Sequence, residues 1–235
     1  MTLQKVIVRK IPRADRSVIA GLAEMGTATV HEAAGQTGLM SPAIRPLQNG
    51  AAIAGSAVTV LCPAGDNLIV HASVEVLQPG DVLVIALTSP ADHGAIGELL
   101  VTSFRAHGCV GLVAECGVRD HAEINALGFP VWGRVVHAQG TQKNLAGSVN
   151  VPIVCGGQAV APGDVIVADN DGVCVIPRAD AATVLAAARS RVEKEKATRQ
   201  HLQSGELGVD YYGFRQKIKD LGITYVDEAP REERG

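Results

Sequence analysis

The chain of 235 residues lacks several short motifs that would assign a function at once. Neither the G-x-G-x-x-G nor the P-loop spacing occurs, so we expect no bound dinucleotide or nucleoside triphosphate. The G-x-S-x-G elbow of many serine hydrolases is missing as well. No glycine-rich loop for S-adenosylmethionine supports a methyltransferase. The sequence therefore excludes several common enzyme classes.

Long apolar runs and an excess of positive charge are also missing. No segment approaches the roughly 20 apolar residues of a membrane span, and the start of the chain, Met1–Val6, has no signal-peptide profile. The formal net charge is −3, and no basic stripe interleaved with aromatic residues occurs. We therefore expect a cytoplasmic protein that contacts neither nucleic acid nor membrane.

Aromatic residues make up only 3% of the chain, so Ala, Val and Gly must build its interior. Such small side chains favour closely packed layers of strands and helices over a sandwich anchored on aromatic residues. The chain is long enough to bury a core of this kind.

The cysteines are few, odd in number and without any C-x-x-C pair. We expect them to be free, buried thiols in a reducing compartment, and no Cys/His spacing predicts a zinc site. The five are Cys62, Cys109, Cys116, Cys155 and Cys174.

Hydrophobic periodicity predicts a chain of mixed helices and strands. We expect helices over residues 13–25, from about 29, and over 67–76, 95–107 and 180–202. We expect strands over residues 51–62, 81–86, 109–115, 131–136, 151–154, 165–168 and 173–176. This order predicts an α/β body with a mixed sheet, because the eight regular alternations of a TIM barrel are absent.

The long helix predicted after Asp180 changes character along its length. Its apolar stripe runs from Ala181 to Val192, and the same spacing then meets Glu195 and Arg199. These charges either extend into water as an ordinary i,i+4 pair or face another subunit. The charged tail, Ala229–Gly235, is expected to be loosely held.

The segment Cys109–Asp120 carries the first candidate site. Its apolar run predicts a strand buried on both faces, which we expect Gly117 to end. Arg119 and Asp120 then lie where the chain leaves the strand, and their charges suit an anionic substrate and a hard metal ion. The spacing of Asp120 and Glu123 equally fits a helix capping box.

A second candidate is the glycine turn before the helix predicted over residues 95–107. The segment Gly94–Leu100 offers free backbone N–H groups to an anion, although Glu98 fits a mere complement to the helix dipole.

Further acidic residues and histidines have structural interpretations. Thr29 and Glu32 have the spacing of a capping box, and Asp169–Gly172 fits a hairpin turn better than a calcium loop. His71 and His93 are expected in packing or loops, whereas His121 is a minor candidate for acid–base chemistry. No lysine is placed in an apolar run, so we expect a metal rather than an imine to act on carbonyl substrates.

Three motifs together resemble one enzyme family. Gly97–Leu100, Gly117–Asp120 and Asp171–Val173 are similar to motifs of the RraA-like class II pyruvate aldolases, the 4-hydroxy-4-methyl-2-oxoglutarate / 4-carboxy-4-hydroxy-2-oxoadipate aldolases. The resemblance implies a layered α/β body of the swivelling β/β/α type over residues 1–178. It also implies a C-terminal helical extension over residues 179–235 that contacts a neighbouring subunit, in a homotrimer or homohexamer.

The resemblance also implies roles for individual residues. Asp120 would hold Mg²⁺ or Mn²⁺, with Glu98 helping through a water, and Arg119 would bind the carboxylate and carbonyl oxygens of a pyruvyl group. The backbone N–H groups of Gly97, Glu98, Leu99 and Leu100 would complete that anion site. Two carboxylates would come from near the first helices and from a neighbour's C-terminal helix; Glu32 and Glu195 match these positions, with Glu193 close to the second.

The activity implied is metal-dependent retro-aldol cleavage in the catabolism of aromatic acids. The substrates would be 4-hydroxy-2-oxo acids, cleaved to pyruvate and a second oxo acid, with oxaloacetate decarboxylation as a side activity. The alternative is a non-catalytic regulator of the RraA type that binds a ribonuclease. The C-terminal extension favours the aldolase, because such regulators are typically shorter.

Overall fold

The computed structural model describes residues 5–228, so the predicted loose tail at 229–235 lies outside the described residues. The chain divides into two compact units, Met1–Arg191 and Val192–Gly235. The boundary between them falls within helix α6 (Ala181–Gln203), whereas the sequence suggested a division before that helix.

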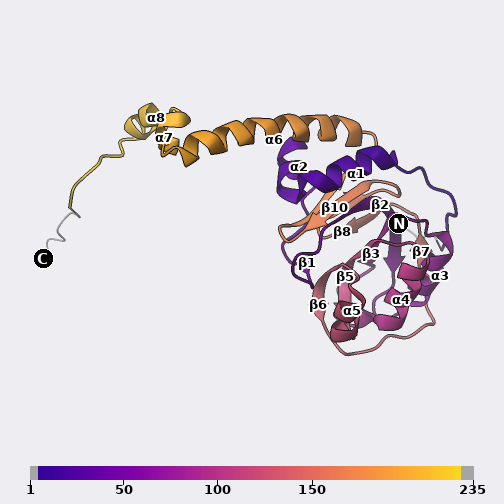
Figure 1. The fold of residues 1–235 in the computed structure, drawn as a ribbon. Helices are drawn as coiled ribbons and strands as arrows, with labels where there is room; N and C mark the ends of the chain where they lie inside the picture. Colours follow the sequence, from indigo (N-terminus) through magenta and orange to yellow (C-terminus); the bar gives the residue numbers. More distant parts are fainter. Residues whose placement is uncertain (1–4, 229–235) are drawn as a thin grey trace, which may run out of the picture. The chain divides into compact units, whose positions relative to one another are not determined.

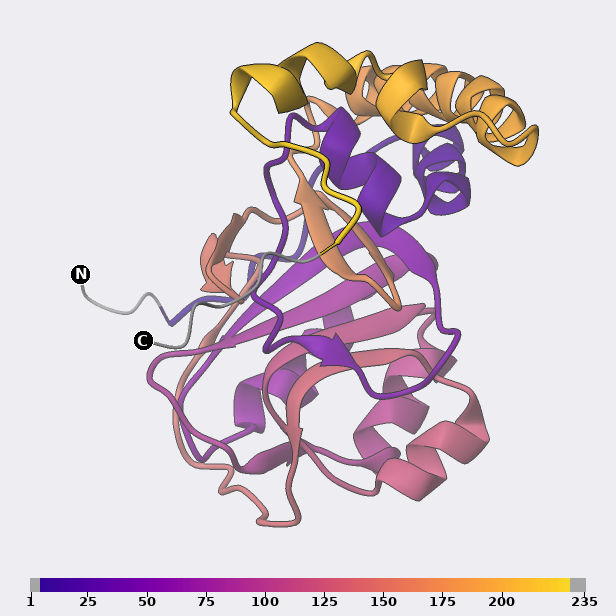
Figure 2. The same ribbon diagram turned by 90° about the vertical axis from the view of Figure 1, so that its left-hand side faces the viewer.

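The first unit is built around a nine-stranded mixed sheet (Figures 1 and 2). Its order is β1-β6-β5-β3-β2-β10-β11, and β4 and β7 pair with β5 and β2 respectively. The strands are β1 (Arg45–Pro46), β2 (Ile53–Cys62), β3 (Asp81–Leu87), β4 (Gly94–Ile96), β5 (Gly111–Val118), β6 (Val131–Val136), β7 (Ser148–Val149), β10 (Val165–Asp169) and β11 (Gly172–Ile176).

The middle of this sheet is parallel and its edges are antiparallel. β2, β3, β5 and β6 run parallel to one another, while β1, β10 and β11 pair antiparallel. The carboxyl ends of the parallel strands therefore meet at one edge, where α/β proteins usually bind ligands. The hairpin of β8 (Ile153–Cys155) and β9 (Gln158–Val160) forms a separate small sheet.

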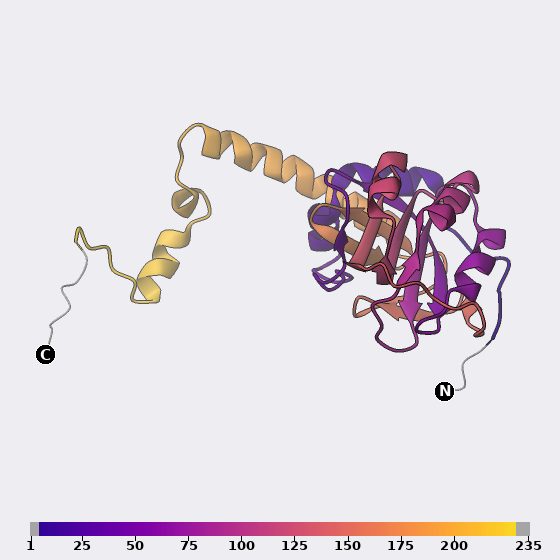
Figure 3. The same ribbon diagram turned by 90° about the horizontal axis from the view of Figure 1, so that it is seen from below.

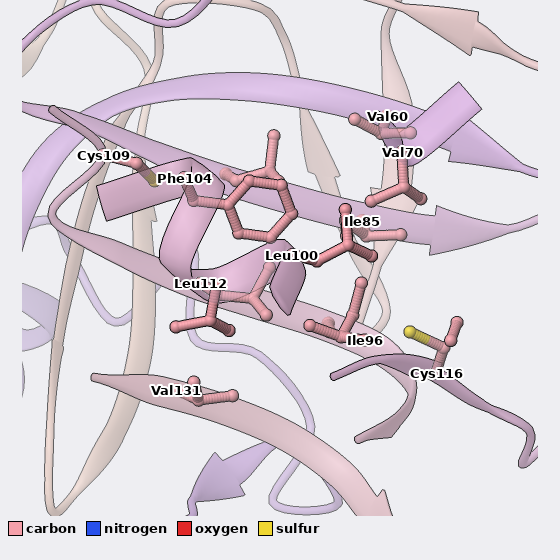
Figure 4. Packing of buried hydrophobic residues seen from close by; sticks show 14 of the residues in the cluster. Val60, Val70, Ile85, Ile96, Leu100, Phe104, Cys109, Leu112, Cys116 and Val131 are labelled. Carbon is pink, nitrogen blue, oxygen red and sulfur yellow. The ribbon is translucent and has the colours of Figure 1, made fainter. Parts of the chain in front are cut away.

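Both faces of the sheet are buried, because successive side chains of a strand point to opposite sides. Helices α3 (Leu68–Ser73), α4 (Glu98–Ala106) and α5 (His121–Leu127) cover one face (Figure 3). Leu83 and Ile85 of β3 belong to the apolar cluster under these helices, and Figure 4 shows Ile85 beside Phe104. Val82 and Val84 pack on the other face with Trp132 and residues of the β8–β9 hairpin. The predicted layered α/β body is confirmed.

A third apolar cluster joins α1 (Arg16–Met25), α2 (Thr27–Ala33) and the start of α6 to β10 and β11. The Asp15 carboxylate accepts a hydrogen bond from the Ser17 N–H at 2.7 Å and so caps α1. The β10–β11 pairing joins Asp169 to Gly172, which confirms the predicted hairpin turn.

Two local predictions are wrong. Gly117 does not end its strand, because β5 continues to Val118 and pairs there with β4. A Cβ at Gly117 would collide with the carbonyl oxygens of Asp92 and His93, so this glycine permits a close approach of backbones. The helix predicted from residue 95 begins only at Glu98, because residues 94–96 form β4.

The capping box predicted for Thr29 and Glu32 is also wrong. Helix α2 begins at Thr27, and Gly26 is its N-cap residue. Asp169 Oδ2 accepts a hydrogen bond from the Thr27 N–H at 2.8 Å, so the cap comes from the β10–β11 hairpin. The Glu32 carboxylate is therefore not used in capping this helix.

All five cysteines are free and buried, as predicted. Burial raises the pKa of each thiol, to about 12 for Cys62 and Cys116, so these side chains behave as small apolar groups.

The second unit contains the remainder of α6, α7 (Gly208–Tyr211) and α8 (Phe214–Asp220). None of its described residues, 192–228, is buried. Tyr212 stacks on Phe214 with ring centroids 5.3 Å apart, and both side chains remain about half exposed. Within residues 5–228, no helix has the length and apolar character needed to cross a bilayer.

Candidate active site

Two chain segments meet where β4 and β5 end. The Arg119 N–H donates a hydrogen bond to the Ile96 carbonyl oxygen at 2.8 Å, which continues the β4–β5 pairing by one residue. Beyond this bond, the segment that follows β4 turns at Gly97 into α4, and the segment that follows β5 turns at Asp120 into α5. The two sequence motifs that carry the candidate site therefore lie side by side.

Asp120 bridges these segments. It is the N-cap residue of α5 with a left-handed backbone (φ 55°), but its side chain makes no capping bond to α5. Instead, Asp120 Oδ2 accepts a hydrogen bond from the Glu98 N–H at 3.1 Å, at the start of α4. The capping-box interpretation of Asp120 and Glu123 is thus wrong, because the carboxylate caps the neighbouring helix.

Gly97 makes room for this arrangement. A Cβ atom at position 97 would lie 2.5 Å from Asp120 Oδ2 and 3.0 Å from Arg119 Nε. Real Cβ atoms do not approach another atom as closely as 2.5 Å, so a side chain at position 97 would displace the Asp120 carboxylate. A glycine at this position lets both charges lie directly against the backbone of the turn.

The two charges contact each other only loosely. Arg119 Nε lies 3.7 Å from Asp120 Oδ2, and the two side chains are 47% and 42% exposed. An exposed pair of this kind contributes little to stability, and its guanidinium N–H groups are accessible from solvent. The pair is therefore better suited to binding than to holding the fold together.

A pocket of about 160 Å³ opens beside this pair. Its lining joins the turn at Gly97 to the first turn of α3 and to the loop before β7. The lining residues are Asn67, His71, Ala95, Gly97, Leu99, Leu100, Arg119, Asp120 and Lys143. Two cationic side chains, one carboxylate, one imidazole and one amide thus converge on a space of small-metabolite size.

Three of these residues were not predicted from the sequence. His71 was expected in packing or a loop, Asn67 was expected only at a helix start, and Lys143 carried no predicted role. Burial, and secondarily the charge of Lys143, lowers the pKa of His71 below its usual value of 6.5. The lowered pKa favours the neutral imidazole.

Asp66 fastens the loop that carries Lys143 to helix α3. The carboxylate is fully buried and accepts hydrogen bonds from the N–H groups of Leu68 (2.9 Å), Asn144 (2.6 Å) and Leu145 (3.1 Å). Burial alone would raise the pKa of Asp66, but these backbone donors outweigh it and the pKa is lowered. These bonds tie the segment that carries Lys143 to the helix that carries His71, and both residues line the pocket.

The other predicted site residues lie apart from this lining. The Glu98 side chain accepts a hydrogen bond from Thr102 Oγ1 at 2.7 Å, and only its backbone N–H reaches Asp120. Glu32 is exposed on α2, where Arg191 Nη1 lies 3.5 Å from Glu32 Oε2. Glu195 belongs to the second unit. His121 contacts the Leu47 carbonyl oxygen at 2.9 Å and does not line the pocket.

A larger pocket, of about 510 Å³, lies between α1 and the turn before β3. Its most buried charge, Asp81, is already held in two 2.8 Å hydrogen bonds from Arg13. We place the candidate active site in the smaller pocket, because its charged groups are not engaged in such a tight mutual pair.

Comparison with known proteins identifies the family. The family model RraA-like, described as Aldolase/RraA, matches residues 27–175, which include the whole pocket lining. The chain belongs to the RraA-like family.

Named relatives and solved structures agree with this assignment. A protein of Halalkalibacterium halodurans named "Putative 4-hydroxy-4-methyl-2-oxoglutarate aldolase" is 33% identical over 178 residues, or 76% of this chain and 84% of that protein. A protein of Burkholderia multivorans with the same name is 35% identical, covering 61% of this chain and 87% of its own length. The crystal structure of Streptomyces coelicolor RraAS2, described as an unusual member of the RNase ES inhibitor RraA protein family, is 27% identical with a TM-score of 0.72, over 81% of this chain and 99% of that one.

Proposed function

We propose that this RraA-like protein is a class II pyruvate aldolase. It cleaves 4-hydroxy-2-oxo acids, such as 4-carboxy-4-hydroxy-2-oxoadipate and 4-hydroxy-4-methyl-2-oxoglutarate, to pyruvate and a second oxo acid. The names of the relatives support an aldolase activity. The observation that carries the proposal is the convergence of Arg119, Asp120 and the N-terminus of α4 on one pocket.

The pocket offers a binding site for the pyruvyl half of such a substrate. The Leu99 and Leu100 N–H groups lie in the first turn of α4, where backbone donors have no partner within the helix. The partial positive charge of that helix end and the planar Arg119 guanidinium both favour a carboxylate with an adjacent carbonyl. Lys143, on the other side of the lining, supplies a second cation for the further carboxylates of a di- or tricarboxylic acid.

Asp120, the one carboxylate in the pocket lining, suits Mg²⁺ or Mn²⁺. Among residues 5–228, no group of three or more His, Cys, Asp or Glu side chains gathers as a complete metal site. Mg²⁺ commonly binds through one or two carboxylates and keeps several waters and substrate oxygens. We propose that Asp120 ligates the ion directly and that Glu98 acts through a water. When bound, the ion supplies a Lewis acid for the substrate's carbonyl oxygen.

The bond changes follow from the substrate. A water acting as base takes the proton of the C4 hydroxyl, which becomes a carbonyl. The C3–C4 bond breaks at the same time, and its electron pair forms the enolate of pyruvate over C2 and C3. A proton then adds to C3 and gives pyruvate. Arg119 holds the enolate oxygen and the carboxylate as negative charge develops, so it stabilises the transition state more than the substrate. Oxaloacetate reaches the same enolate by losing carbon dioxide.

We further propose that the site is completed by neighbouring subunits of a homotrimer or homohexamer. Glu32 and Glu195, with Glu193 as the nearby alternative, are the carboxylates that would reach a neighbour's pocket. The exposed second unit supports an assembly, because eight large apolar side chains of residues 192–228 are accessible. They are Leu202, Leu207, Tyr212, Phe214, Leu221, Ile223, Tyr225 and Val226.

The proposal is tested with chelator-stripped protein. Oxaloacetate and 4-carboxy-4-hydroxy-2-oxoadipate are each incubated with and without Mg²⁺, and pyruvate release is followed. Metal-dependent pyruvate from both substrates is expected. Absence of pyruvate at every metal concentration contradicts the proposal.

A ribonuclease-binding regulator is the second candidate, favoured by the likeness to the RraAS2 structure. Under that alternative the purified protein releases no pyruvate but retains a ribonuclease in a pull-down. The charged pocket favours the aldolase, because a purely protein-binding role does not require an anion site beside a carboxylate.

A further inference from the structure

A third pocket, of about 230 Å³, lies at the carboxyl ends of the parallel strands β3, β5 and β6. Crevices outside the carboxyl ends of such strands are where α/β proteins usually bind ligands. The lining residues are Leu87, Thr88, Ser89, Pro90, Glu115 and Arg134. The candidate active site shares none of them, so this pocket is a separate space.

The two charged residues of the third pocket point to the sheet face that carries the β8–β9 hairpin. Glu115 follows Val113 by two positions on β5, and side chains two apart on a strand share a face. Arg134 follows Trp132 in the same way on β6. Val113 and Trp132 belong to the apolar cluster on the hairpin side. Burial, and secondarily the charge of Glu115, raises the pKa of the Cys155 thiol on β8, which agrees with this placement.

A β-bulge lies at the point where these charges meet. The register of β5 and β6 shifts directly after the pair Ala114–Gly133, so the bulge begins at Glu115, opposite Arg134. Bulges re-aim side chains and are frequent next to active sites. Neighbouring strands lie about 4.8 Å apart, so one small molecule can reach both charges.

The protein satisfies neither charge well. The Glu115 side chain is half-buried, yet it makes no hydrogen bond or ion pair with any residue between 5 and 228. Arg134 Nε lies 3.7 Å from Asp92 Oδ1, and these two side chains are 41% and 61% exposed. That contact is too long for a hydrogen bond and stabilises little. Because a half-buried carboxylate without a donor costs free energy, we expect a cationic donor at Glu115 when the pocket is filled.

The pair of charges narrows the class of ligand. A simple anion would satisfy Arg134 and leave Glu115 without a partner, and a simple amine or metal ion would do the reverse. A molecule that carries an ammonium group and a carboxylate on neighbouring atoms satisfies both through charge-assisted hydrogen bonds. The pocket is smaller than those of drug-sized ligands, which fits a molecule of this kind.

We propose that the third pocket binds the zwitterion of a free α-amino acid. Its ammonium group donates to the Glu115 carboxylate, and its carboxylate accepts from the Arg134 guanidinium. The exposed hydroxyls of Thr88 and Ser89 lie at the rim, where they can bond a polar side chain of the ligand. This inference does not depend on the proposed aldolase function.

The experiment uses the full-length protein. Each of the common L-amino acids is tested for its effect on the melting temperature, because a ligand of the folded state raises it. Calorimetry then gives the dissociation constant of each amino acid that binds and of its two analogues, one without the amino group and one without the carboxyl group. For L-alanine these are propionate and ethylamine. We expect the amino acid to bind about tenfold or more tightly than either analogue, because each analogue loses one charge-assisted hydrogen bond.

Variants of the two charged residues assign the contacts. Glu115→Gln removes the charge and keeps the shape, so the preference for the amino acid over propionate or its counterpart should disappear. The preference over the amine should remain. Arg134→Gln should give the opposite pattern, and its exposed side chain can be replaced without loss of the fold. Glu75→Gln is the matched control, because Glu75 is exposed in the short helix Val74–Val76 and does not line the pocket.

The outcomes are separate from those of the aldolase assays. Preferences that change in opposite directions in the two variants support the inference, because misfolding would weaken all three ligands together. Absence of binding by every amino acid overturns it, and so does equal affinity for an amino acid and its analogues. Binding that pyruvate competes away, or that Arg119→Lys weakens, would place the amino acid in the candidate active site and also overturns it.

Discussion

The Asp120 carboxylate accepts a hydrogen bond from the Glu98 N–H across 3.1 Å and so links the end of β5 to the start of α4. This bond brings a carboxylate, the adjacent Arg119 guanidinium and a helix N-terminus to one pocket. Under the proposed function, the metal ion, the substrate carboxylate and the enolate oxygen would all bind in this pocket.

Replacement of Arg119 by lysine tests the anion site. Lysine keeps the charge but loses the planar pair of N–H donors that fits a carboxylate and an adjacent carbonyl. We expect kcat/KM for pyruvate release to fall about a hundredfold or more, with little change in thermal stability because the side chain is 47% exposed. Steady-state kinetics and a melting curve check this, and near-normal turnover contradicts the assigned role.

Substitution of Gly97 by alanine tests the close packing of the turn. The added Cβ would lie 2.5 Å from Asp120 Oδ2, so the carboxylate and Arg119 must move. We expect the dissociation constant for pyruvate, measured by calorimetry, to rise about tenfold or more. Gly208→Ala is the control, because a Cβ there meets only ordinary contacts of 3.7 Å or more. Equal affinities in the two variants would mean that the turn tolerates a side chain.

Asp66 is expected to make stability depend on pH. Its folded-state pKa lies below the ordinary aspartate value of 3.8, so its stabilising effect is present above that value and is lost as the pH falls toward the folded-state pKa. Asp66→Asn would pair its backbone donors less well, and we expect a loss of about 2 kcal/mol in the free energy of unfolding at pH 7. Urea denaturation at pH 7 and pH 3 checks this. The difference between the wild-type and variant free energies of unfolding should be smaller at pH 3 than at pH 7, and a constant difference contradicts the account.

His71 and Lys143 are expected to influence each other across the pocket. The lowered pKa of His71 has burial as its first cause and the Lys143 charge as its second. Lys143→Met removes the second cause, so the pKa of His71 should rise toward, without reaching, its usual value of 6.5. Titration of the imidazole by NMR measures the change. An unchanged pKa would show that Lys143 does not face His71.

Much of the fold followed from the sequence because buried strands leave a strong local signal. The strand predicted over 131–136 has those bounds as β6, and the long helix after Asp180 begins and ends within one residue of its prediction. β4 was missed because three residues carry no periodicity. Gly117 misled the prediction because a glycine inside a strand and a glycine at its end look alike when the chain beside it is unknown.

The site was predictable in part for the same reason. Arg119, Asp120 and the Gly97 turn form short continuous motifs that sequence patterns can show. Asn67, His71 and Lys143 reach the pocket only through tertiary contacts, such as the three hydrogen bonds that Asp66 accepts. Sequence patterns show only neighbours along the chain, so they could not predict these contacts. The roles of Glu32 and Glu195 stay predictions.

The most direct test of the aldolase account compares pyruvate release by the wild-type protein and the Asp120→Asn variant across a Mg²⁺ titration. Asparagine can still accept the Glu98 N–H hydrogen bond, so the turn is preserved while the charge is removed. Glu123→Gln is the matched control, because Glu123 lies in the first turn of α5 outside the pocket lining. The account predicts metal-dependent cleavage of 4-carboxy-4-hydroxy-2-oxoadipate in the wild type and the control, and a loss of about a hundredfold or more in Asp120→Asn. Full activity of that variant at the same Mg²⁺ concentrations would contradict the account.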